Sequence, residues 1–372
     1  MLAWIERRGP SAISRSGPVG RGQPSGMEYR ALGRSGLKVS TMTMGTMTFG
    51  GKGGFSTLGT TDVEGATRQI DLCVDHGVNL VDTADMYSAG VSEEIVGQAT
   101  KNHRDDLLLA TKCRFPMGDG PNDGGASRQH IVRSCEDSLR RLGVEHIDLY
   151  QLHGWDGQTP LEETLEALDT LVRKGKIRYI GCSNYSAWHV MKALGVSERG
   201  EYQRFVSQQI HYTLQAREAE NELVPVSIDQ GLGILVWSPI AGGLLSGKFR
   251  RGQDDPETSR HLGEWSEPPV HDRERLYDIV EVAAEIADGH GVSVAQVANA
   301  WLLHKPGVTS LVIGARTEEQ LADNLGAAEL ALTSDEVGRL DEVSAMPLLY
   351  PYWHQKNTIT DRLSPADASL LT

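Results

Sequence analysis

The stretch "IDLYQLHGWDGQTPLEETLEALDTLVRKGKIRYIGCS" (residues 147–183) sets the pattern of the whole chain. It begins and ends with a short apolar run, 147–153 and 177–183, and the segment between the two runs has helical character. The apolar residues in each run are continuous rather than alternating, as in parallel strands that are covered on both faces. The stretch therefore predicts a strand, a helix and a second, parallel strand.

The segment between the two runs carries signals for the start and the end of a helix. Thr159 and Glu162 have the spacing of a capping box, Pro160 stands at the expected first helical position, and Gly175 follows the last turn. The face expected to be buried consists of Leu161, Leu165, Leu168 and Val172. Segment 127–143 predicts a second helix of this kind. Its expected buried face consists of Ile131, Cys135, Leu139 and Leu142.

The same alternation of apolar runs and helical segments extends from residue 39 to residue 330. The other runs are 39–45, 79–85, 107–113, 205–211, 233–239 and 309–315. Eight strands separated by helices predict an α/β fold, a single-domain (β/α)8 TIM barrel. An open doubly wound sheet is the alternative, but no G-x-G-x-x-G follows the first run. The segment "GGKGG" (50–54) has neither that spacing nor the G-K-[ST] of a phosphate-binding loop.

Three further segments stand out from the barrel pattern. Residues 244–272, after the seventh run, are too many for an ordinary connection and predict a functional loop. Residues 1–26 lack the apolar stretch of a signal peptide and predict a disordered extension, with a misassigned start or a transit-like segment as alternatives. The barrel is then expected over 27–345, and the tail 346–372, with "YPYWHQ" (350–355), either approaches the substrate pocket or packs on the barrel.

The composition excludes several classes of protein. The net charge is −14, and an acidic chain repels nucleic-acid backbones. No apolar run reaches the roughly 18 residues that a membrane helix needs. Cys73, Cys113, Cys135 and Cys182 are scattered, which predicts neither a zinc site nor a disulfide framework, but reduced thiols in a cytoplasmic protein.

Titratable side chains stand at the ends of three consecutive strands. Asp82 and Tyr87 follow the second run, Lys112 ends the third, and His153 ends the fourth. In such barrels the carboxyl ends of the strands meet at the active-site face. An ammonium group stabilises a phenolate and so lowers the pKa of the phenol. A carboxylate holds the ammonium, and an imidazole orients a carbonyl oxygen, so the set suits a tuned proton donor. Reduction of a carbonyl also needs a hydride, which implies a nicotinamide cofactor.

Each of these four residues also has an ordinary structural explanation when it is taken alone. Asp82 would cap the following helix, and Tyr87 would be an aromatic wall residue. Lys112 would be a surface lysine with a buried stem, and His153 a core histidine. It is the combination at one end of the barrel that favours catalysis.

Several segments resemble the successive signatures of the aldo-keto reductase superfamily, in the family's order. They are "NLVDTADMYSAGVSEEIVGQA", "LLLATKC", "IDLYQLHGWD", "RYIGCSNYS", "VSQQIHYTLQAR", "WSPIAGGLLSGK" and "VIGARTEEQLADNLGA". The chain is most similar to the bacterial branch with aryl-alcohol-dehydrogenase-like and channel-β-subunit-like members. The resemblance implies a barrel that binds NADP(H) and an NADP-dependent enzyme that reversibly reduces aldehydes or ketones to alcohols.

The resemblance also implies roles for individual residues. Tyr87 would be the general acid, tuned by Lys112 and Asp82, while His153 and Trp155 would face the substrate together with Tyr87. The implied cofactor residues are Thr46, Met47, Asp82, Ser183, Asn184, Gln209, Trp237, Ser238, Pro239, Ile240, Ala241, Gly243, Lys248, Gly314, Arg316, Gln320 and Asn324. A planar guanidinium at Arg316 suits a 2′-phosphate and favours NADP over NAD. Gln320 has a second interpretation, since Thr317 and Gln320 also have the spacing of a capping box.

Three functions compete on this sequence. The first is the NADPH-dependent reductase, which acts on a small-molecule carbonyl or alcohol. The second is an NADPH-binding regulatory protein with slow turnover, as in the channel β subunits. The third is a hydrolase or isomerase on a similar barrel, and the sequence shows no Asp/Glu/His cluster for a metal-dependent version. The first function accounts for the largest number of residues, and an oligomer is compatible with all three.

Overall fold

Eight parallel strands form a closed barrel in the computed structural model of the chain, which describes residues 26–256 and 267–371. The order around the barrel is β10-β3-β4-β5-β6-β7-β8-β9. The strands are β3 (Met42–Gly45), β4 (Leu80–Asp82), β5 (Leu108–Cys113), β6 (Ile147–Leu152), β7 (Ile177–Ser183), β8 (Ser207–His211), β9 (Gly233–Trp237) and β10 (Val308–Ile313). The predicted (β/α)8 barrel is confirmed, and each predicted run supplies one barrel strand.

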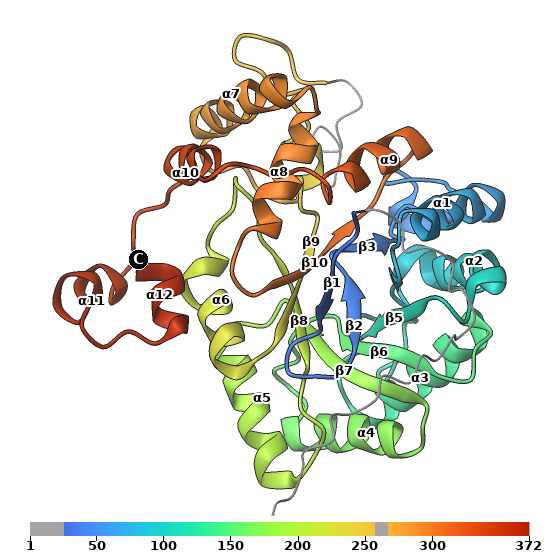
Figure 1. Cartoon of the computed structure of the whole chain (residues 1–372). Coiled ribbons are helices and arrows are strands. Elements are labelled where there is room, and N and C mark those ends of the chain that lie inside the picture. The colour runs from blue at the N-terminus through green and yellow to red at the C-terminus, as the bar shows by residue number, and fades with distance from the viewer. Residues whose placement is uncertain (1–25, 257–266, 372) are drawn as a thin grey trace, which may run out of the picture.

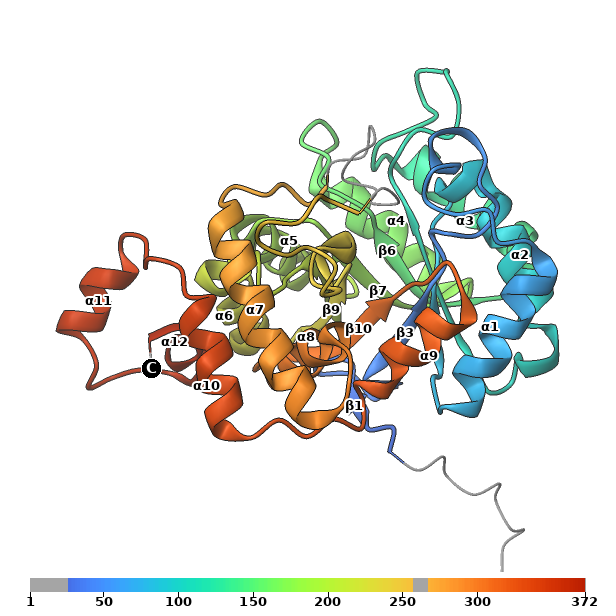
Figure 2. The same ribbon diagram turned by 90° about the horizontal axis from the view of Figure 1, so that it is seen from above.

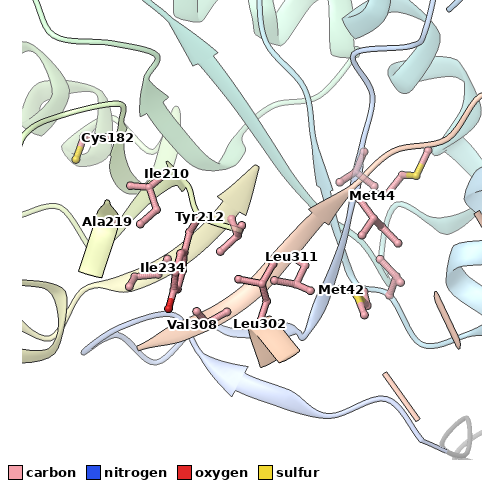
Figure 3. Close-up of a cluster of buried hydrophobic side chains, with 14 of the residues drawn as sticks. Met42, Met44, Cys182, Ile210, Tyr212, Ala219, Ile234, Leu302, Val308 and Leu311 are labelled. Atoms are coloured by element: carbon pink, nitrogen blue, oxygen red, sulfur yellow. The ribbon is translucent and has the colours of Figure 1, made fainter. Parts of the chain in front are cut away.

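Helices surround the strands on the outside, as Figure 1 shows. They are α1 (Val63–Asp75), α2 (Val91–Ala99), α3 (Arg128–Leu142), α4 (Leu161–Arg173), α5 (Ala187–Gly200), α6 (Ala219–Gln230), α7 (Arg273–His290), α8 (Val294–Leu303), α9 (Glu318–Gly326) and α10 (Ser334–Val343). Side chains from strands and helices fill the layer between them; Figure 3 shows Met42, Ile210 and Leu311 from strands beside Ala219 and Leu302 from helices.

The apolar runs are continuous because successive strand residues are buried on opposite sides of the barrel wall. Val81 and Tyr150 belong to the outer cluster against the helices. Their neighbours Leu80 and Leu149 belong to a separate inner cluster, which fills the barrel together with Leu32 of the N-terminal segment. This two-sided burial explains why a period-two pattern is missing from the sequence.

An antiparallel hairpin of β1 (Tyr29–Ala31) and β2 (Lys38–Ser40) lies across the end of the barrel where the strands begin. The run 39–45, expected as one strand, is therefore divided. Its first residues pair within the hairpin, and the chain enters the barrel only after Thr41. The hairpin turn needs Gly33, whose φ is +58° and whose added Cβ would lie 2.3 Å from the Val206 carbonyl oxygen.

The helix α3 buries the four residues that its pattern predicts. In α4, by contrast, the predicted capping box is wrong. Pro160 is the N-cap without a side-chain bond, and the Thr159 hydroxyl instead donates to Asp156 Oδ2 at 2.7 Å. Because its hydroxyl is bonded to Asp156, Thr159 does not cap the helix. Leu161, Leu165 and Leu168 are buried as predicted, and Val172 is partly buried.

The segments outside the barrel pattern differ from one another. Part of the long loop, 257–266, and residues 1–25 of the predicted extension lie outside the described residues. The tail forms α11 (Tyr352–Thr358) and α12 (Pro365–Leu371), and α12 packs against α6 beside the helical ring (Figures 1 and 2). Within 26–256 and 267–371, no helix is both long and apolar enough to cross a membrane.

The hairpin turn gives a first prediction. Gly33→Ala should lower the free energy of unfolding more than Gly143→Ala does, as measured by urea denaturation. Both residues have a positive φ, but an added Cβ meets backbone only at Gly33 and nothing within 4 Å at Gly143. The control should cost about 1–2 kcal/mol from its φ alone. If the two substitutions lower the unfolding free energy equally, the hairpin turn accommodates the added Cβ without destabilising the barrel.

Candidate active site

A cavity of about 690 Å³ opens at the carboxyl ends of the barrel strands. Its wall includes residues that end or follow β3, β4, β5, β6, β7, β9 and β10, together with Gln209 within β8. In (β/α)8 barrels this face carries the functional groups, and the size suits a cofactor or a small molecule. The residues of this cavity are therefore the candidate site.

A buried ion pair stands at the base of the cavity. Lys112 on β5 and Asp82 on β4 are 0% and 1% exposed, and the distance from Lys112 Nζ to Asp82 Oδ2 is 2.5 Å. Lys112 Nζ also donates to the Thr83 carbonyl oxygen at 2.8 Å and to the Tyr87 hydroxyl at 3.3 Å. The ammonium group thus has one partner for each of its three hydrogens, and one of these partners is the phenol.

Two glutamines fix the other oxygen of Asp82. Gln151 Nε2 on β6 and Gln209 Nε2 on β8 donate to Asp82 Oδ1 at 2.9 and 3.0 Å. A buried carboxylate needs such donors, because each unsatisfied lone pair is costly in a low-dielectric interior. Gln209 was expected from the sequence as a cofactor residue, and it lines the cavity while holding Asp82. Gln151 has no counterpart among the predictions.

His153 lies beside the phenol. Its ring centroid is 5.7 Å from that of Tyr87 in an edge-on arrangement, and 4.9 Å from that of Phe115. Its Nδ1 is buried and has no hydrogen-bond partner among the described residues. Burial lowers the pKa of His153 well below its ordinary value, and the charges of Lys112 and Arg114 act in the same direction. The imidazole is therefore neutral near pH 7 and can present one N–H to an oxygen in the cavity.

The same surroundings keep the phenol and the lysine protonated. Burial raises the pKa of Tyr87 above its ordinary value, and the ammonium of Lys112 opposes this rise without reversing it. Burial by itself would lower the pKa of Lys112, but the charge of Asp82 and the hydrogen bonds to Asp82 and Tyr87 outweigh burial and raise it. The sequence predicts a lowered phenol pKa, and this is wrong for the protein alone because desolvation is the larger effect.

A second hydrogen-bonded group surrounds Asn184, in the loop after β7. Its side chain accepts from Trp237 Nε1 at 3.0 Å and donates to the His153 carbonyl oxygen at 3.3 Å. Its backbone has a φ of +56°, a conformation that asparagine adopts more readily than most residues. Ser183 donates to the Gln209 carbonyl oxygen at 2.9 Å. These bonds fix Trp237, Asn184 and His153 relative to one another.

The loop after β9 and the start of α9 form the opposite wall. From Ala241 to Leu245, the backbone N–H groups bond within the loop itself. A phosphate there would therefore depend on side chains, and Lys248 and Arg316 line the cavity. Arg316 also donates to the carbonyl oxygens of Leu58 and Thr57 at 3.3 and 3.4 Å, which ties it to the loop after β3.

The structure brings most of the predicted residues to the cavity wall. These are Thr46, Met47, Asp82, Tyr87, His153, Ser183, Asn184, Gln209, Trp237, Ser238, Pro239, Ile240, Gly243, Lys248, Gly314, Arg316, Gln320 and Asn324. Lys112 lies behind Tyr87, and Ala241 is wholly buried in its loop. The N-cap Thr317 accepts from the Gln320 backbone as predicted, but Gln320 Oε1 accepts from the Arg316 N–H rather than from Thr317.

Trp155 is not brought to the cavity. Its ring stacks on His189 with a centroid distance of 3.8 Å and also contacts Tyr185 and Trp188. The sequence position of Trp155, close to His153, therefore did not determine the direction of the Trp155 side chain. Instead, the aromatic wall near Tyr87 is formed by Phe55 and Phe115, and Phe249 lines the cavity from the long loop. Phe115 lies two residues after the end of β5, so the strand-end rule was able to find it.

Sequence reasoning also missed Asp85, two residues before Tyr87. Its side chain is buried, and neither carboxylate oxygen has a hydrogen-bond partner among the described residues. Burial raises the pKa of Asp85 well above its ordinary value, and nearby Glu93 adds to the rise. Glu93 is itself paired with Arg141 and Thr111, each at 2.6 Å. The folded protein therefore favours the neutral acid at Asp85.

Within 26–256 and 267–371, no group of three or more His, Cys, Asp or Glu side chains is placed to hold a metal ion. The four cysteines are buried and free. The tail helices α11 and α12 contribute no residue to the cavity wall, which is drawn from residues 45 to 324.

Known proteins match this chain over most of its length. The profile of the Aldo/keto reductase family matches residues 41–345. An uncharacterized oxidoreductase, YrpG, of Bacillus subtilis is 38% identical over 86% of this chain and 97% of its own length. A probable voltage-gated potassium channel subunit beta of Arabidopsis thaliana is 36% identical, covering 85% and 96%. The versiconal hemiacetal acetate reductase of Aspergillus parasiticus is 34% identical, covering 87% and 99%.

The burial of Asp85 gives a second prediction. In the unfolded chain Asp85 ionises near pH 3.8, while the folded chain holds the proton to higher pH. The stability contributed by this proton is complete below about pH 4 and falls as pH rises, by about 1.4 kcal/mol per pH unit. Asp85→Asn removes the dependence, so its unfolding free energy should gain on that of the parent as pH rises above about 4. The unfolding free energies of the variant and the parent are measured by urea denaturation at each pH. If their difference does not change with pH, Asp85 is ionised in the folded protein.

Proposed function

The chain belongs to the aldo/keto reductase family of oxidoreductases, and from this premise we propose that it reduces aldehydes or ketones with NADPH, reversibly, using Tyr87 as the proton donor. The observation that carries the proposal is the bonded series from Asp82 through Lys112 to the Tyr87 hydroxyl, beside a neutral His153 at the base of the cavity. This arrangement supplies a proton and an oxygen-binding group at one place.

The cavity fits a nicotinamide dinucleotide phosphate by its chemistry. Near Tyr87, Ser183, Asn184 and Gln209 offer hydroxyl and amide groups for a carboxamide, and Trp237 offers an aromatic surface. Across the barrel, Lys248 and Arg316 offer cations for phosphates. In the barrel order, β9 and β10 are neighbours, on the side away from β5 and β6. A nicotinamide dinucleotide phosphate has a carboxamide at one end and a phosphorylated adenosine at the other, and a negatively charged pyrophosphate joins them.

When bound, NADPH supplies the hydride that adds to the carbonyl carbon. The residues of this chain then act on the carbonyl oxygen. His153, being neutral, donates an N–H to it, and Tyr87 Oη gives it a proton as negative charge develops. The ammonium of Lys112 stabilises the phenolate that remains, while Asp82 keeps this ammonium in place.

The protonation state of Tyr87 suits the direction of reduction. Because burial raises the pKa of Tyr87, the phenol carries its proton at neutral pH and is ready to act as an acid. Alcohol oxidation needs the phenolate as base, so it should become faster in alkaline solution. The aromatic surfaces of Phe55 and Phe115 next to Tyr87 suit aryl and other apolar carbonyls.

A regulatory protein is the second candidate, because the Arabidopsis thaliana relative is named as a probable voltage-gated potassium channel subunit beta. Such a protein would bind NADPH and turn over slowly. The intact hydrogen bonds among Asp82, Lys112 and Tyr87 favour the enzyme. Turnover and binding, measured separately, decide between the two functions.

The third prediction concerns the proton donor. Tyr87→Phe should lower kcat for NADPH oxidation with aromatic aldehydes, followed at 340 nm, by about 100- to 10,000-fold, the usual contribution of a general acid. The dissociation constant for NADPH should change little. Tyr179→Phe, outside the cavity wall, is the matched control. Equal rates for Tyr87→Phe and the parent would contradict the role, and tight NADPH binding without turnover on any carbonyl would favour the regulatory protein.

The fourth prediction separates two roles of Arg316. If its guanidinium pairs with a 2′-phosphate, Arg316→Gln should weaken NADP⁺ binding about tenfold or more and NAD⁺ binding by much less. Titration calorimetry with both dinucleotides gives the comparison. An equal loss for NADP⁺ and NAD⁺ would show that Arg316 supports the loop, through bonds such as those to the Thr57 and Leu58 carbonyls, and does not recognise a 2′-phosphate.

A further inference from the structure

Asn299 is an amide in the middle of an apolar helix. It lies on α8 between residues that are all buried, Val297 and Ala298 before it and Ala300 and Trp301 after it. Asn299 itself is 0% exposed, and its Oδ1 has no hydrogen-bond partner among the described residues. A buried amide oxygen without a donor costs free energy that an apolar residue at the same place would avoid. The position therefore calls for a partner.

The side chain lies at the cavity wall. Asn299 lines the cavity together with Ala295, which is one helical turn earlier on the same face of α8. From α9, which packs beside α8, Gln320 and Asn324 line the same region. Asn299 thus borders the end of the cavity where Arg316 and Gln320 stand, away from Tyr87.

Asn299 and Asn324 are joined in a defined orientation. Asn299 Nδ2 points to Asn324 Oδ1 at 3.4 Å. This contact uses one donor and one acceptor, and it leaves Asn299 Oδ1 as an acceptor and Asn324 Nδ2 as a donor. The neighbouring Asp323 is held from α8, since its oxygens accept from Ser293 and Gln296 at 2.7 and 2.8 Å. The two asparagines thus present a neutral acceptor–donor pair.

An acceptor next to a donor is the pattern that adenine recognises. Adenine carries an amino donor beside a ring-nitrogen acceptor, and asparagine pairs with these groups in protein–nucleic acid contacts. If the proposed function holds, the nicotinamide lies near Tyr87 and the adenosine end near Arg316. The base amino group is then the N–H donor that the cofactor brings to this end of the cavity.

We propose that Asn299 is a base-selective residue of the cofactor site, whose Oδ1 accepts a hydrogen bond from the amino group of adenine while Asn324 donates to an adjacent ring nitrogen. This inference rests on the proposed function and adds to it a residue from α8. It also explains why an amide occupies a helix position whose sequence neighbours are all apolar.

The test compares NADP⁺ with its analogue in which hypoxanthine replaces adenine. Hypoxanthine has a carbonyl oxygen where adenine has the amino group, so an acceptor would face Asn299 Oδ1. The full chain should bind NADP⁺ about tenfold more tightly than the analogue, in keeping with one buried hydrogen bond gained or lost. Binding is measured by titration calorimetry without substrate, so the result does not depend on turnover.

Asn299→Leu conserves the size of the side chain and removes its polar atoms. It should weaken NADP⁺ binding about five- to tenfold and reduce the preference for adenine to about twofold or less. Gln69→Leu is the matched control, because Gln69 on α1 is also buried with a free amide oxygen but does not line the cavity. If Asn299→Leu does not fold, Asn299→Ser, whose side chain is too short to reach the same donor, takes its place.

The outcomes separate this inference from the proposed function. Loss of adenine preference in the Asn299 variant, with preference kept in the Gln69 variant, supports the inference. Equal binding of both dinucleotides by the parent, or an unchanged preference in the variant, overturns it. Failure of the parent to bind either dinucleotide overturns the proposed function, and this inference with it.

Discussion

The candidate site depends on one buried charge, the ammonium of Lys112. A fully buried ion pair is stable only when geometry and further hydrogen bonds offset desolvation. Here the carboxylate that pairs with Lys112 is Asp82 of β4. The two side chains that donate to this carboxylate, Gln151 and Gln209, come from β6 and β8. The closed barrel places these strand ends around one point, and no open sheet would surround the charge in this way. The fold is therefore a condition for the site as well as its support.

Burial and this one charge together set the protonation of the neighbouring groups. Burial, reinforced by the ammonium, keeps His153 neutral, and the ammonium moderates the rise that burial causes in the pKa of Tyr87. One group is thus ready to donate a hydrogen bond, and the other is ready to give a proton. The aromatic rings of Phe55 and Phe115 pack against Tyr87 and His153. Burial, rather than any single contact, sets the chemistry of the cavity.

The barrel was predictable because its signal repeats. Each strand run is buried on both sides, so continuous apolar stretches mark it, and strand-end residues such as Lys112 and His153 meet by topology alone. Features with a single local cause were not predictable. The Thr159 hydroxyl donates to Asp156 instead of capping the helix, and Trp155 stacks on His189. The hairpin divides the first apolar run. Asp85 and Asn299 were missed because a sequence does not show which polar side chains lack partners in the fold, although an amide within an apolar helix was a visible signal.

The central claim is that Tyr87, and not His153, gives the proton to the substrate. The most direct test is the pH dependence of kcat/KM for reduction of an aromatic aldehyde by NADPH, measured from about pH 5 to about pH 11. Because the pKa of Tyr87 lies above its ordinary value of 10 and His153 stays neutral, the profile should be flat through neutral pH and fall only in strongly alkaline solution. A fall centred near pH 6.5, the ordinary pKa of histidine, would show that protonated His153 is the donor and would contradict the account.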